Sequence, residues 1–250
     1  MYPDLKDRVV LVTGSSRGVG AAIALAFADV GARVVLHGRD EVALTAVRER
    51  IGGPAIIVTG DVTSSADLDR MREKITAAFG PVDVLVANAG STASRPTPIE
   101  EIDEAAWRSD VELNLTSTFL TVKCFLPEMK RRGTGNIITI SSAAGRRPSA
   151  HTIVAYGAAK AGLQVFTQDL AAQVGPAGIR ANCIAPETIL TETNRQWIPA
   201  EQQERLAQLH PVRRLGMPED VARAALFLAS DHSGWISGVI LDIAGGATLV

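Results

Sequence analysis

The sequence predicts a doubly wound α/β fold, with about seven parallel strands and helices on both faces of the sheet. Short β-branched runs alternate with longer helical patterns from the start of the chain, as in consecutive βαβ units. The predicted strands are continuous apolar runs, which is typical of strands that helices cover on both faces. With 250 residues, 46% of them hydrophobic, the chain is long enough for a large core. We therefore expect one domain spanning residues 1–250.

The predicted elements alternate along the whole chain. The sequence predicts strands at residues 8–14, 32–38, 55–60, 83–90, 136–142, 179–186 and 238–246. It predicts helices at residues 17–30, 40–51, 64–79, 103–131, 155–174 and 218–230. Residues 188–210 carry no strand signal, so we interpret them as a helical lid over a site, with Trp197 as its anchor.

The charge balance favours small-molecule chemistry. Lys and Arg number 25 and Asp and Glu number 27, for a net charge of −2. Such a chain has no global field that would attract nucleic acid or an anionic membrane. The start of the chain lacks the pattern of a signal peptide, and no apolar run reaches the roughly 18 residues of a membrane span. We expect a soluble, cytoplasmic protein.

The cysteines and histidines predict no metal site. Cys124 and Cys183 each lie in an apolar segment, and neither stands at metal-ligand spacing from a histidine. The four histidines are scattered. Buried, reduced thiols are therefore the expectation for both cysteines.

A glycine-rich loop follows the first predicted strand. Residues 13–20 read TGSSRGVG and lead directly into an amphipathic helix. Gly14, Gly18 and Gly20 permit a tight turn and let backbone N–H groups approach a pyrophosphate at the helix N-terminus. This position between a strand and a helix predicts a dinucleotide site.

Several separated motifs together resemble one family. The TGxxxGxG loop, NAG at 88–90, ITISS at 138–142 and the pair Tyr156 and Lys160 are similar to the motifs of short-chain dehydrogenases/reductases, in the single-domain branch. The resemblance runs from Leu5 to Gly246. It implies a Rossmann fold and an oxidoreductase that transfers hydride between a nicotinamide cofactor and a carbonyl or secondary alcohol.

The end of the second predicted strand favours NADP(H), although NAD(H) is possible. An acidic residue about 20 positions after the glycines suits the ribose diol of NAD, whereas arginine suits the 2′-phosphate of NADP. Arg39 occupies this position, and Arg17 lies inside the glycine loop. The alternative is Asp40, which suits a diol but is also a natural N-cap for the next helix.

The resemblance also implies further cofactor contacts. Asp61 and Val62 correspond to the residues that meet adenine, although Asp61 or Thr63 can equally cap the following helix. After the sixth strand, the family has a segment that holds the nicotinamide carboxamide, and Pro186, Ile189 and Thr191 match it. Glu187 stands where the family usually has glycine, and its role stays open. The remaining implied contacts are Ser16, Val19, Asn88, Ala89, Gly90, Tyr156, Lys160, Pro186, Ile189 and Thr191.

Four residues carry the predicted chemistry. Tyr156 and Lys160 are four positions apart, so they share one helix face. A phenol has a reference pKa of about 10, and a nearby ammonium group would favour its ionised form. The resemblance makes Tyr156 the general acid or base, Ser142 a hydrogen-bond donor to the substrate oxygen, and Asn114 the anchor of a proton-relay water. Ser141 is the alternative serine.

The substrate and partners are less defined by sequence. Loops 91–98, 143–155 and 188–210 are expected to line the pocket, with an apolar lining from Ala144, Ile153, Val154 and Trp197. Arg146, Arg147 and His151 suit an anionic group, or are simply solvated. The resemblance implies a homotetramer.

Two narrower or different functions stay open. Within the family, the pattern is similar to that of 3-oxoacyl-[acyl-carrier-protein] reductases, and basic residues at 130–136 suit a carrier protein. However, Pro176 and Ala177 stand where a basic docking residue is often found, so this partner is unsupported. A non-catalytic NADP-binding sensor or scaffold is the other alternative, and the complete set of four catalytic residues argues against it.

Overall fold

The predicted fold class is confirmed in the computed structural model, which describes residues 2–149 and 152–248. The described chain forms a seven-stranded sheet in the order β3-β2-β1-β4-β5-β6-β7, with every neighbouring pair parallel. The strand order reverses beside β1, which pairs with β2 on one side and β4 on the other. The strands are β1 (Val9–Val12), β2 (Arg33–Gly38), β3 (Ala55–Thr59), β4 (Val84–Ala87), β5 (Gly135–Ile140), β6 (Ile179–Pro186) and β7 (Ile240–Ile243).

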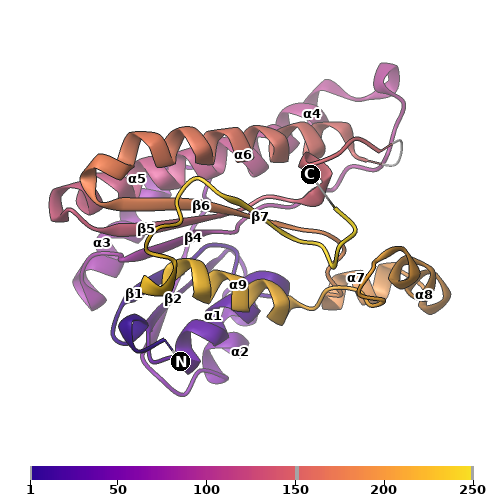
Figure 1. Ribbon diagram of the computed structural model, residues 1–250. Helices are drawn as coiled ribbons and strands as arrows, with labels where there is room; N and C mark the ends of the chain where they lie inside the picture. The colour runs from indigo at the N-terminus through magenta and orange to yellow at the C-terminus, as the bar shows by residue number, and fades with distance from the viewer. Residues whose placement is uncertain (1, 150–151, 249–250) are drawn as a thin grey trace.

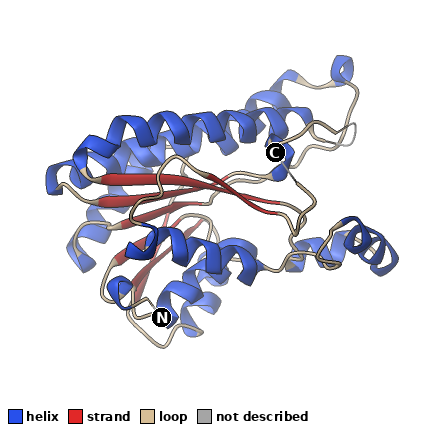
Figure 2. Ribbon diagram, in the orientation of Figure 1, coloured by secondary structure: helices blue, strands red, loops and turns tan. Residues whose placement is uncertain are grey.

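Helices cover both faces of this sheet (Figures 1 and 2). One layer contains α1 (Gly18–Asp29), α2 (Glu41–Glu49) and α9 (Pro218–Ala229). The other contains α3 (Ser65–Phe79), α4 (Glu104–Val111), α5 (Ser117–Arg132) and α6 (Val154–Val174). Among the described residues, no helix is long and apolar enough to cross a membrane.

The continuous apolar strands supply two cores at once. In β1, Val10 and Val12 pack with the layer of α1, α2 and α9, whereas Val9 and Leu11 pack with the layer of α3, α5 and α6. Because successive side chains of a strand point to opposite faces, each core takes alternate residues. This explains why the strands lack the alternating pattern of a half-exposed sheet.

The long helix predicted over residues 103–131 is interrupted. Between α4 and α5, residues Glu112–Thr116 form a single π-helical turn that contains the buried Asn114. A π turn inserts one extra residue into the helical frame and is frequent at functional sites. The periodicity of the sequence did not reveal this interruption.

The predicted lid is helical, but its predicted anchor is wrong. Residues 188–210 include α7 (Glu192–Trp197) and α8 (Ala200–Leu209), which extend beyond one end of the sheet (Figure 1). Trp197 is 73% exposed and therefore does not hold the lid. Instead, the Asn194 side chain at the start of α7 donates a hydrogen bond to the Ile189 carbonyl, at 2.7 Å.

Candidate active site

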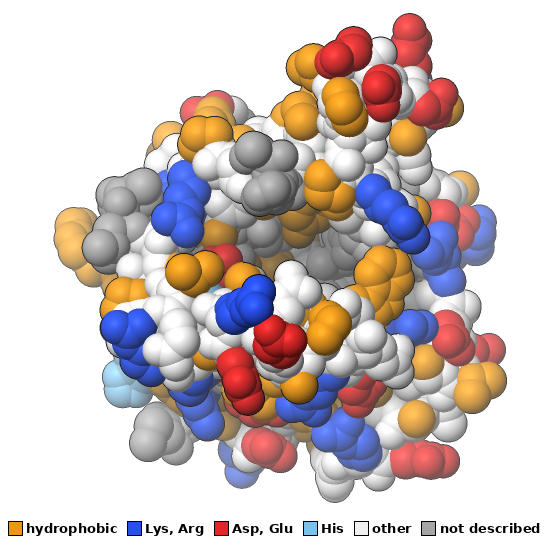
Figure 3. Space-filling view, turned by 90° about the vertical axis from the view of Figure 1, so that its right-hand side faces the viewer, with side chains coloured by type: hydrophobic (Ala, Val, Ile, Leu, Met, Phe, Trp, Pro, Cys, Tyr) orange, Lys and Arg blue, Asp and Glu red, His pale blue; other side chains and the backbone are white. Residues whose placement is uncertain are grey.

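The predicted site residues gather at the carboxyl ends of β1, β4, β5 and β6. In doubly wound sheets, ligands bind beyond these ends where the strand order reverses. Figure 3 views the molecule from this side and shows a hollow near the centre of the face. The sheet thus brings together motifs that lie far apart in the sequence.

The glycine loop has a backbone conformation and a close packing that require glycine. Gly14 and Gly18 adopt φ values of +66° and +56°, a conformation that favours glycine. A Cβ atom on Gly20 would lie 2.2 Å from the Gly14 carbonyl oxygen. No side chain caps the start of α1, so its N-terminal N–H groups and helix dipole remain open to an anion. The loop therefore fits a dinucleotide phosphate.

The segment after β4 braces this loop. The Asn88 side chain donates hydrogen bonds to the carbonyls of Thr13 and Gly14, at 2.9 and 3.1 Å. The N–H groups of Asn88 and Ala89 both donate to the Thr13 hydroxyl, at 3.0 Å. The structural role expected for Asn88 is thus present, because it holds the backbone of the glycine loop.

A buried histidine that sequence reasoning missed also holds the loop. His37 is 2% exposed, its Nδ1 accepts from the Gly14 N–H at 3.3 Å, and its Nε2 donates to the Gly60 carbonyl at 3.1 Å. Burial lowers the pKa of His37 to about 4, so the imidazole is neutral at physiological pH. The signal in the sequence was a single polar residue inside the apolar run of β2.

The acidic residues near the nucleotide site have local partners. The Asp40 carboxylate accepts from the Ala43 N–H at 3.0 Å and caps α2, and it lies 3.6 Å from the Arg17 guanidinium. Asp61 accepts from the N–H and hydroxyl of Thr63. These two bonds, more than the nearby Arg39 charge, hold the pKa of Asp61 below its usual value.

The N-cap expectation therefore has two different outcomes. The N-cap role of Asp40 is confirmed. The expectation that Asp61 or Thr63 caps α3 is wrong, because Ser64 is the N-cap and accepts from the Asp67 N–H. Arg39 itself is exposed.

Lys160 is buried between α6 and β5. It is 4% exposed, and its Nζ donates to the Ile140 carbonyl at 2.8 Å. Burial lowers the pKa of Lys160 to about 8. The same Nζ lies 5.6 Å from the centre of the Tyr156 ring. The predicted pair is therefore brought together.

The pKa of Tyr156 is shifted in the direction opposite to the expectation. Burial raises it, the charge of Asp110 raises it further, and a side-chain hydrogen bond with Ser142 only partly offsets both. Desolvation is the largest of these effects, because burial disfavours the charged form of a phenol. Tyr156 therefore holds its proton at neutral pH.

The two candidate serines have distinct surroundings. The Ser141 hydroxyl is buried, donates to the Lys160 carbonyl at 2.8 Å and accepts from the Gln164 side chain at 3.0 Å. Ser142 is half-buried, accepts from the Ala144 N–H at 3.1 Å and shares a hydrogen bond with Tyr156. Ser141 thus ties α6 to β5, whereas Ser142 faces the phenol.

Asn114 presents an unpaired acceptor beside Lys160. Its Nδ2 donates to the carbonyls of Ser91 and Asp110, at 2.7 and 2.9 Å. Its Oδ1 is buried and has no hydrogen-bond partner among the described residues. A Cβ atom on Gly90 would lie 2.8 Å from this oxygen and 3.2 Å from the Lys160 Nζ. Gly90 therefore leaves open the space that Asn114 and Lys160 share.

Asp110 is a second functional candidate that sequence reasoning missed. It is 5% exposed, it accepts from the Ser94 hydroxyl at 2.8 Å, and its charge acts on Tyr156. It lines a cavity of about 210 Å³ with Trp107, Ile153 and others. The signal was an acidic residue one helical turn before Asn114.

Of the basic residues expected to meet an anionic group, Arg146 is engaged elsewhere. Arg146 forms a bidentate ion pair with Asp242 of β7, in which Nε donates to Oδ1 and Nη2 donates to Oδ2, each at 3.0 Å. Arg147 is exposed, and His151 lies outside the described residues. The expectation is thus wrong for Arg146, whose guanidinium is already neutralised.

The segment after β6 reaches back to the glycine loop. Pro186 ends β6, Ile189 is buried, and a Cβ atom on Gly18 would lie 3.3 Å from the Thr191 methyl group. The Thr191 hydroxyl accepts from the Asn194 N–H and caps α7. The structure thus places the predicted carboxamide segment beside the predicted phosphate loop.

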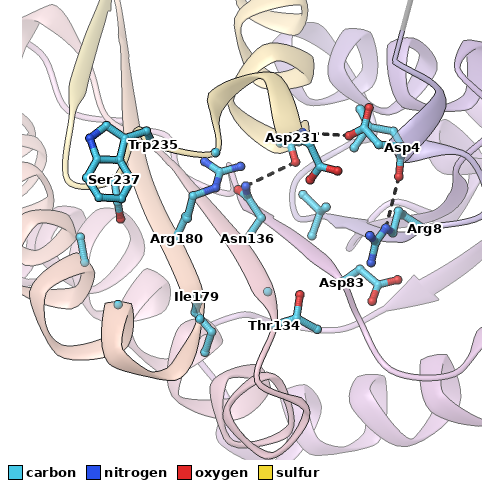
Figure 4. Close-up of a pocket in the computed structure, with 18 residues that line it drawn as sticks. Asp4, Arg8, Asp83, Thr134, Asn136, Ile179, Arg180, Asp231, Trp235 and Ser237 are labelled. Atoms are coloured by element: carbon cyan, nitrogen blue, oxygen red, sulfur yellow. Dashed lines mark hydrogen bonds between the residues drawn. The ribbon is translucent and has the colours of Figure 1, made fainter.

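A larger cavity lies at the opposite, amino-terminal edge of the sheet (Figure 4). It encloses about 590 Å³, and Trp235 is fully exposed at its rim. Arg180 and Asn136 point toward the end of α9 and donate to carbonyls there, including that of Leu228. These contacts satisfy the end of a helix, and they lie far from the catalytic groups.

The comparisons with known proteins agree with this geometry. The family model described as enoyl-(acyl carrier protein) reductase matches residues 14–248. The cis-4-hydroxycyclohexanecarboxylate dehydrogenase of Sinomonas cyclohexanicum is 40% identical, over 98% of each chain. The chain belongs to the short-chain dehydrogenase/reductase family. As a member of this family, it is an oxidoreductase that acts on alcohol or carbonyl groups.

Other short-chain dehydrogenases/reductases extend the comparison. The 3-oxoacyl-[acyl-carrier-protein] reductase FabG of Escherichia coli is 36% identical and covers 99% of this chain and 100% of its own. A structure of 7α-hydroxysteroid dehydrogenase, complexed with NADH and 7-oxo-glycochenodeoxycholic acid, matches with a TM-score of 0.91 at 36% identity. It covers 97% of this chain and 94% of its own. Relatives of this chain therefore bind a nicotinamide cofactor.

Replacing Gly20 with alanine tests the shape of the glycine loop. The added methyl group would overlap the Gly14 carbonyl at 2.2 Å, so the loop must shift. We expect the Kd for NADPH and for NADH, measured by fluorescence titration, to rise about tenfold or more, which corresponds to about 1.4 kcal/mol. Gly53→Ala is the matched control, because nothing lies within 4 Å of its added carbon. An unchanged Kd for Gly20→Ala would contradict this assignment.

Proposed function

We propose that this short-chain dehydrogenase/reductase is an NADP(H)-dependent carbonyl reductase and alcohol dehydrogenase in which Tyr156 is the general acid and base. The observation that carries the proposal is that three groups meet around the Tyr156 phenol. Ser142 is hydrogen-bonded to the phenol, the Lys160 ammonium lies over the face of its ring, and the Asn114 side chain offers an unpaired acceptor nearby. When bound, the cofactor supplies the hydride chemistry. The protein supplies orientation, charge and a proton.

The raised pKa of Tyr156 supports its role as a proton donor. A carbonyl oxygen that accepts hydride at its carbon gains negative charge and needs a proton. Tyr156 carries that proton at neutral pH, because burial and Asp110 disfavour its phenolate. Ser142, already hydrogen-bonded to the phenol, lies where a hydroxyl would polarise the same oxygen. Reduction therefore uses the protonation state that the site already has.

The surroundings of Lys160 support a route for replacing that proton. The ammonium is buried and adjoins the space next to the unpaired Asn114 oxygen. A water in this space would accept from Lys160 and donate to Asn114, which satisfies a buried acceptor that is otherwise costly. We infer that protons move from solvent to Tyr156 through this water and Lys160.

Substitutions of the hydroxyl groups test the assignment. Tyr156→Phe keeps the ring but removes the proton, so we expect kcat for carbonyl reduction to fall at least about a hundredfold. Ser142→Ala should also lower kcat by about 10²-fold or more, with the KM for NADPH within about twofold. Ser141→Ala is the comparison variant and should lower kcat less than Ser142→Ala, because its hydroxyl bonds to the Lys160 carbonyl and to Gln164 and not to the phenol. Survival of turnover in Tyr156→Phe, or a severe loss only in Ser141→Ala, would refute the assignment.

The preference for NADP(H) rests on two exposed arginines. Arg39 follows β2 directly and is exposed, and Arg17 lies in the glycine loop, where its exposed guanidinium lies 3.6 Å from Asp40. A guanidinium group suits a 2′-phosphate. The rival diol ligand, Asp40, is engaged in capping α2. Membership of the family does not distinguish NADP(H) from NAD(H), and the local charges favour NADP(H).

Replacing Arg39 tests the cofactor preference. We expect Arg39→Ala to raise the KM for NADPH about tenfold, because one charge-assisted contact to the 2′-phosphate is lost, and to leave the KM for NADH unchanged. Arg108→Ala, on an exposed face of α4, is the control. Equal efficiency of the wild type with NADH and NADPH, or an unchanged KM for NADPH in Arg39→Ala, would show that the preference is wrong.

We also propose that the chain assembles as a homotetramer. Apolar side chains are exposed on the outer faces of two adjoining helices, Phe119 on α5 at 45% and Val165 on α6 at 58%. Light scattering should give four times the mass of the chain, and Val165→Glu should reduce it. A monomeric mass for the wild type would overturn the proposal.

A further inference from the structure

Glu187 stands where the family usually has glycine, and the structure turns its carboxylate away from the catalytic groups. Its Oε2 lies 2.6 Å from Nε2 of His210. His210 is 4% exposed, whereas Glu187 is half-buried. A buried, charged pair of this kind is costly to build unless both partners are well satisfied, so the surrounding contacts decide what the pair does.

The hydrogen bonds fix the protons on this pair. His210 Nδ1 lies 2.8 Å from the Leu206 carbonyl, which only accepts, so Nδ1 carries a hydrogen. Burial acts to raise the pKa of Glu187, but hydrogen bonds from the Thr188 N–H and from His210 together hold it below its usual value. An ionised carboxylate also only accepts. The Nε2 of His210 therefore faces an acceptor, and the pair is a hydrogen-bonded contact between imidazole and carboxylate.

The charged neighbours of the pair are already matched to one another. The cavity beside it is lined by Arg214, Asp220 and Asp242. Arg214 pairs with Asp220 at 2.6 Å, and Asp242 pairs with Arg146 at 3.0 Å. Each of these groups thus has its own partner, and Glu187 is the carboxylate that contacts His210.

The pair joins the two ends of the lid. Glu187 directly follows β6, and His210 directly follows α8, so α7 and α8 lie in the segment between them. A second contact closes the same base, because the Gly216 N–H donates to the Thr188 carbonyl at 3.1 Å and the Leu190 N–H donates to the Gly216 carbonyl at 2.7 Å. The lid is therefore a loop whose ends are held together at two points.

The position of Thr191 depends on this closed base. Thr191 lies two residues beyond the bridge formed by Ile189 and Gly216, and its methyl group lies against Gly18 of the glycine loop. A movement of Glu187 would be transmitted through Thr188 and Ile189 to this contact. The spacing between the phosphate loop and the lid is thus set partly by His210, which no sequence motif marks.

We propose that Glu187 and His210 are positioning residues that clasp the base of the lid and thereby set the place of residues 188–191 against the glycine loop. This inference rests on the proposed function and on the family resemblance, which assigns Ile189 and Thr191 to the nicotinamide end of the cofactor. It explains the departure from glycine, because a side chain is needed to reach His210. The clasp acts on cofactor and substrate binding, with no part in proton transfer.

Kinetics of variants at both ends of the clasp test the proposal. Glu187→Ala should raise the KM for NADPH at least fivefold while kcat changes less than twofold. The KM for NADPH of Glu187→Gln should stay within about twofold of the wild-type value. The glutamine amide can still form a hydrogen bond with Nε2 of His210, while Nδ1 keeps its bond to the Leu206 carbonyl. In Glu187→Ala/His210→Ala, the effects should be non-additive. Glu201→Gln is the matched control, since Glu201 pairs with Arg205 on the exposed surface of the same lid.

Limited trypsin digestion tests the clasp by a measurement that does not depend on catalysis, namely the rate of cleavage within the lid. Arg195 and Arg205 are exposed within the lid, so Glu187→Ala should be cleaved there at least threefold faster than the wild type and than Glu201→Gln. If Glu187→Ala does not fold, Glu187→Gly, which restores the usual family residue, takes its place. An inactive wild type would refute the proposed function, and the cleavage rates would still test the clasp. An unchanged cleavage rate and an unchanged KM in Glu187→Ala, or fully additive effects in the double variant, would overturn the clasp proposal.

Discussion

The burial of the Lys160 ammonium is the constraint on which the site depends. A buried cation is costly unless it is hydrogen-bonded, and here the Ile140 carbonyl at the end of β5 satisfies it. The Ser141 hydroxyl binds the backbone of Lys160 itself, so α6 and β5 are fixed to each other along their catalytic ends. The place of Tyr156, one turn earlier on α6, follows from this attachment.

The neighbouring elements adapt to that buried charge. Gly90 has no side chain because a Cβ atom would meet both Lys160 and Asn114. The π turn directs Asn114 inward while its Nδ2 holds the backbone of Ser91, in the loop after β4. Three segments from different parts of the chain therefore meet around one ammonium group.

Much of this could be predicted from the sequence because it is encoded locally. The apolar strands, the glycine loop and the cap at Asp40 each depend on residues within one short segment. The pairs that sequence reasoning missed join distant positions: Ser94 with Asp110, Arg146 with Asp242, and Glu187 with His210. A single sequence carries no signal for such pairs, because either partner alone has an ordinary solvated alternative. Trp197 is a similar case, because the sequence does not show whether a large apolar side chain in this segment has a partner, and this one is exposed.

The π turn at Asn114 has a consequence for how the pocket is built. One extra residue in the helical frame rotates α4 by about 100° relative to α5, so the two helices are out of phase. The face of α4 that carries Trp107 and Asp110 is thereby uncoupled from the face of α5 that fills the core. The cavity beside α4 and the core under α5 are therefore built by separate helices, although the two helices follow one another in the chain.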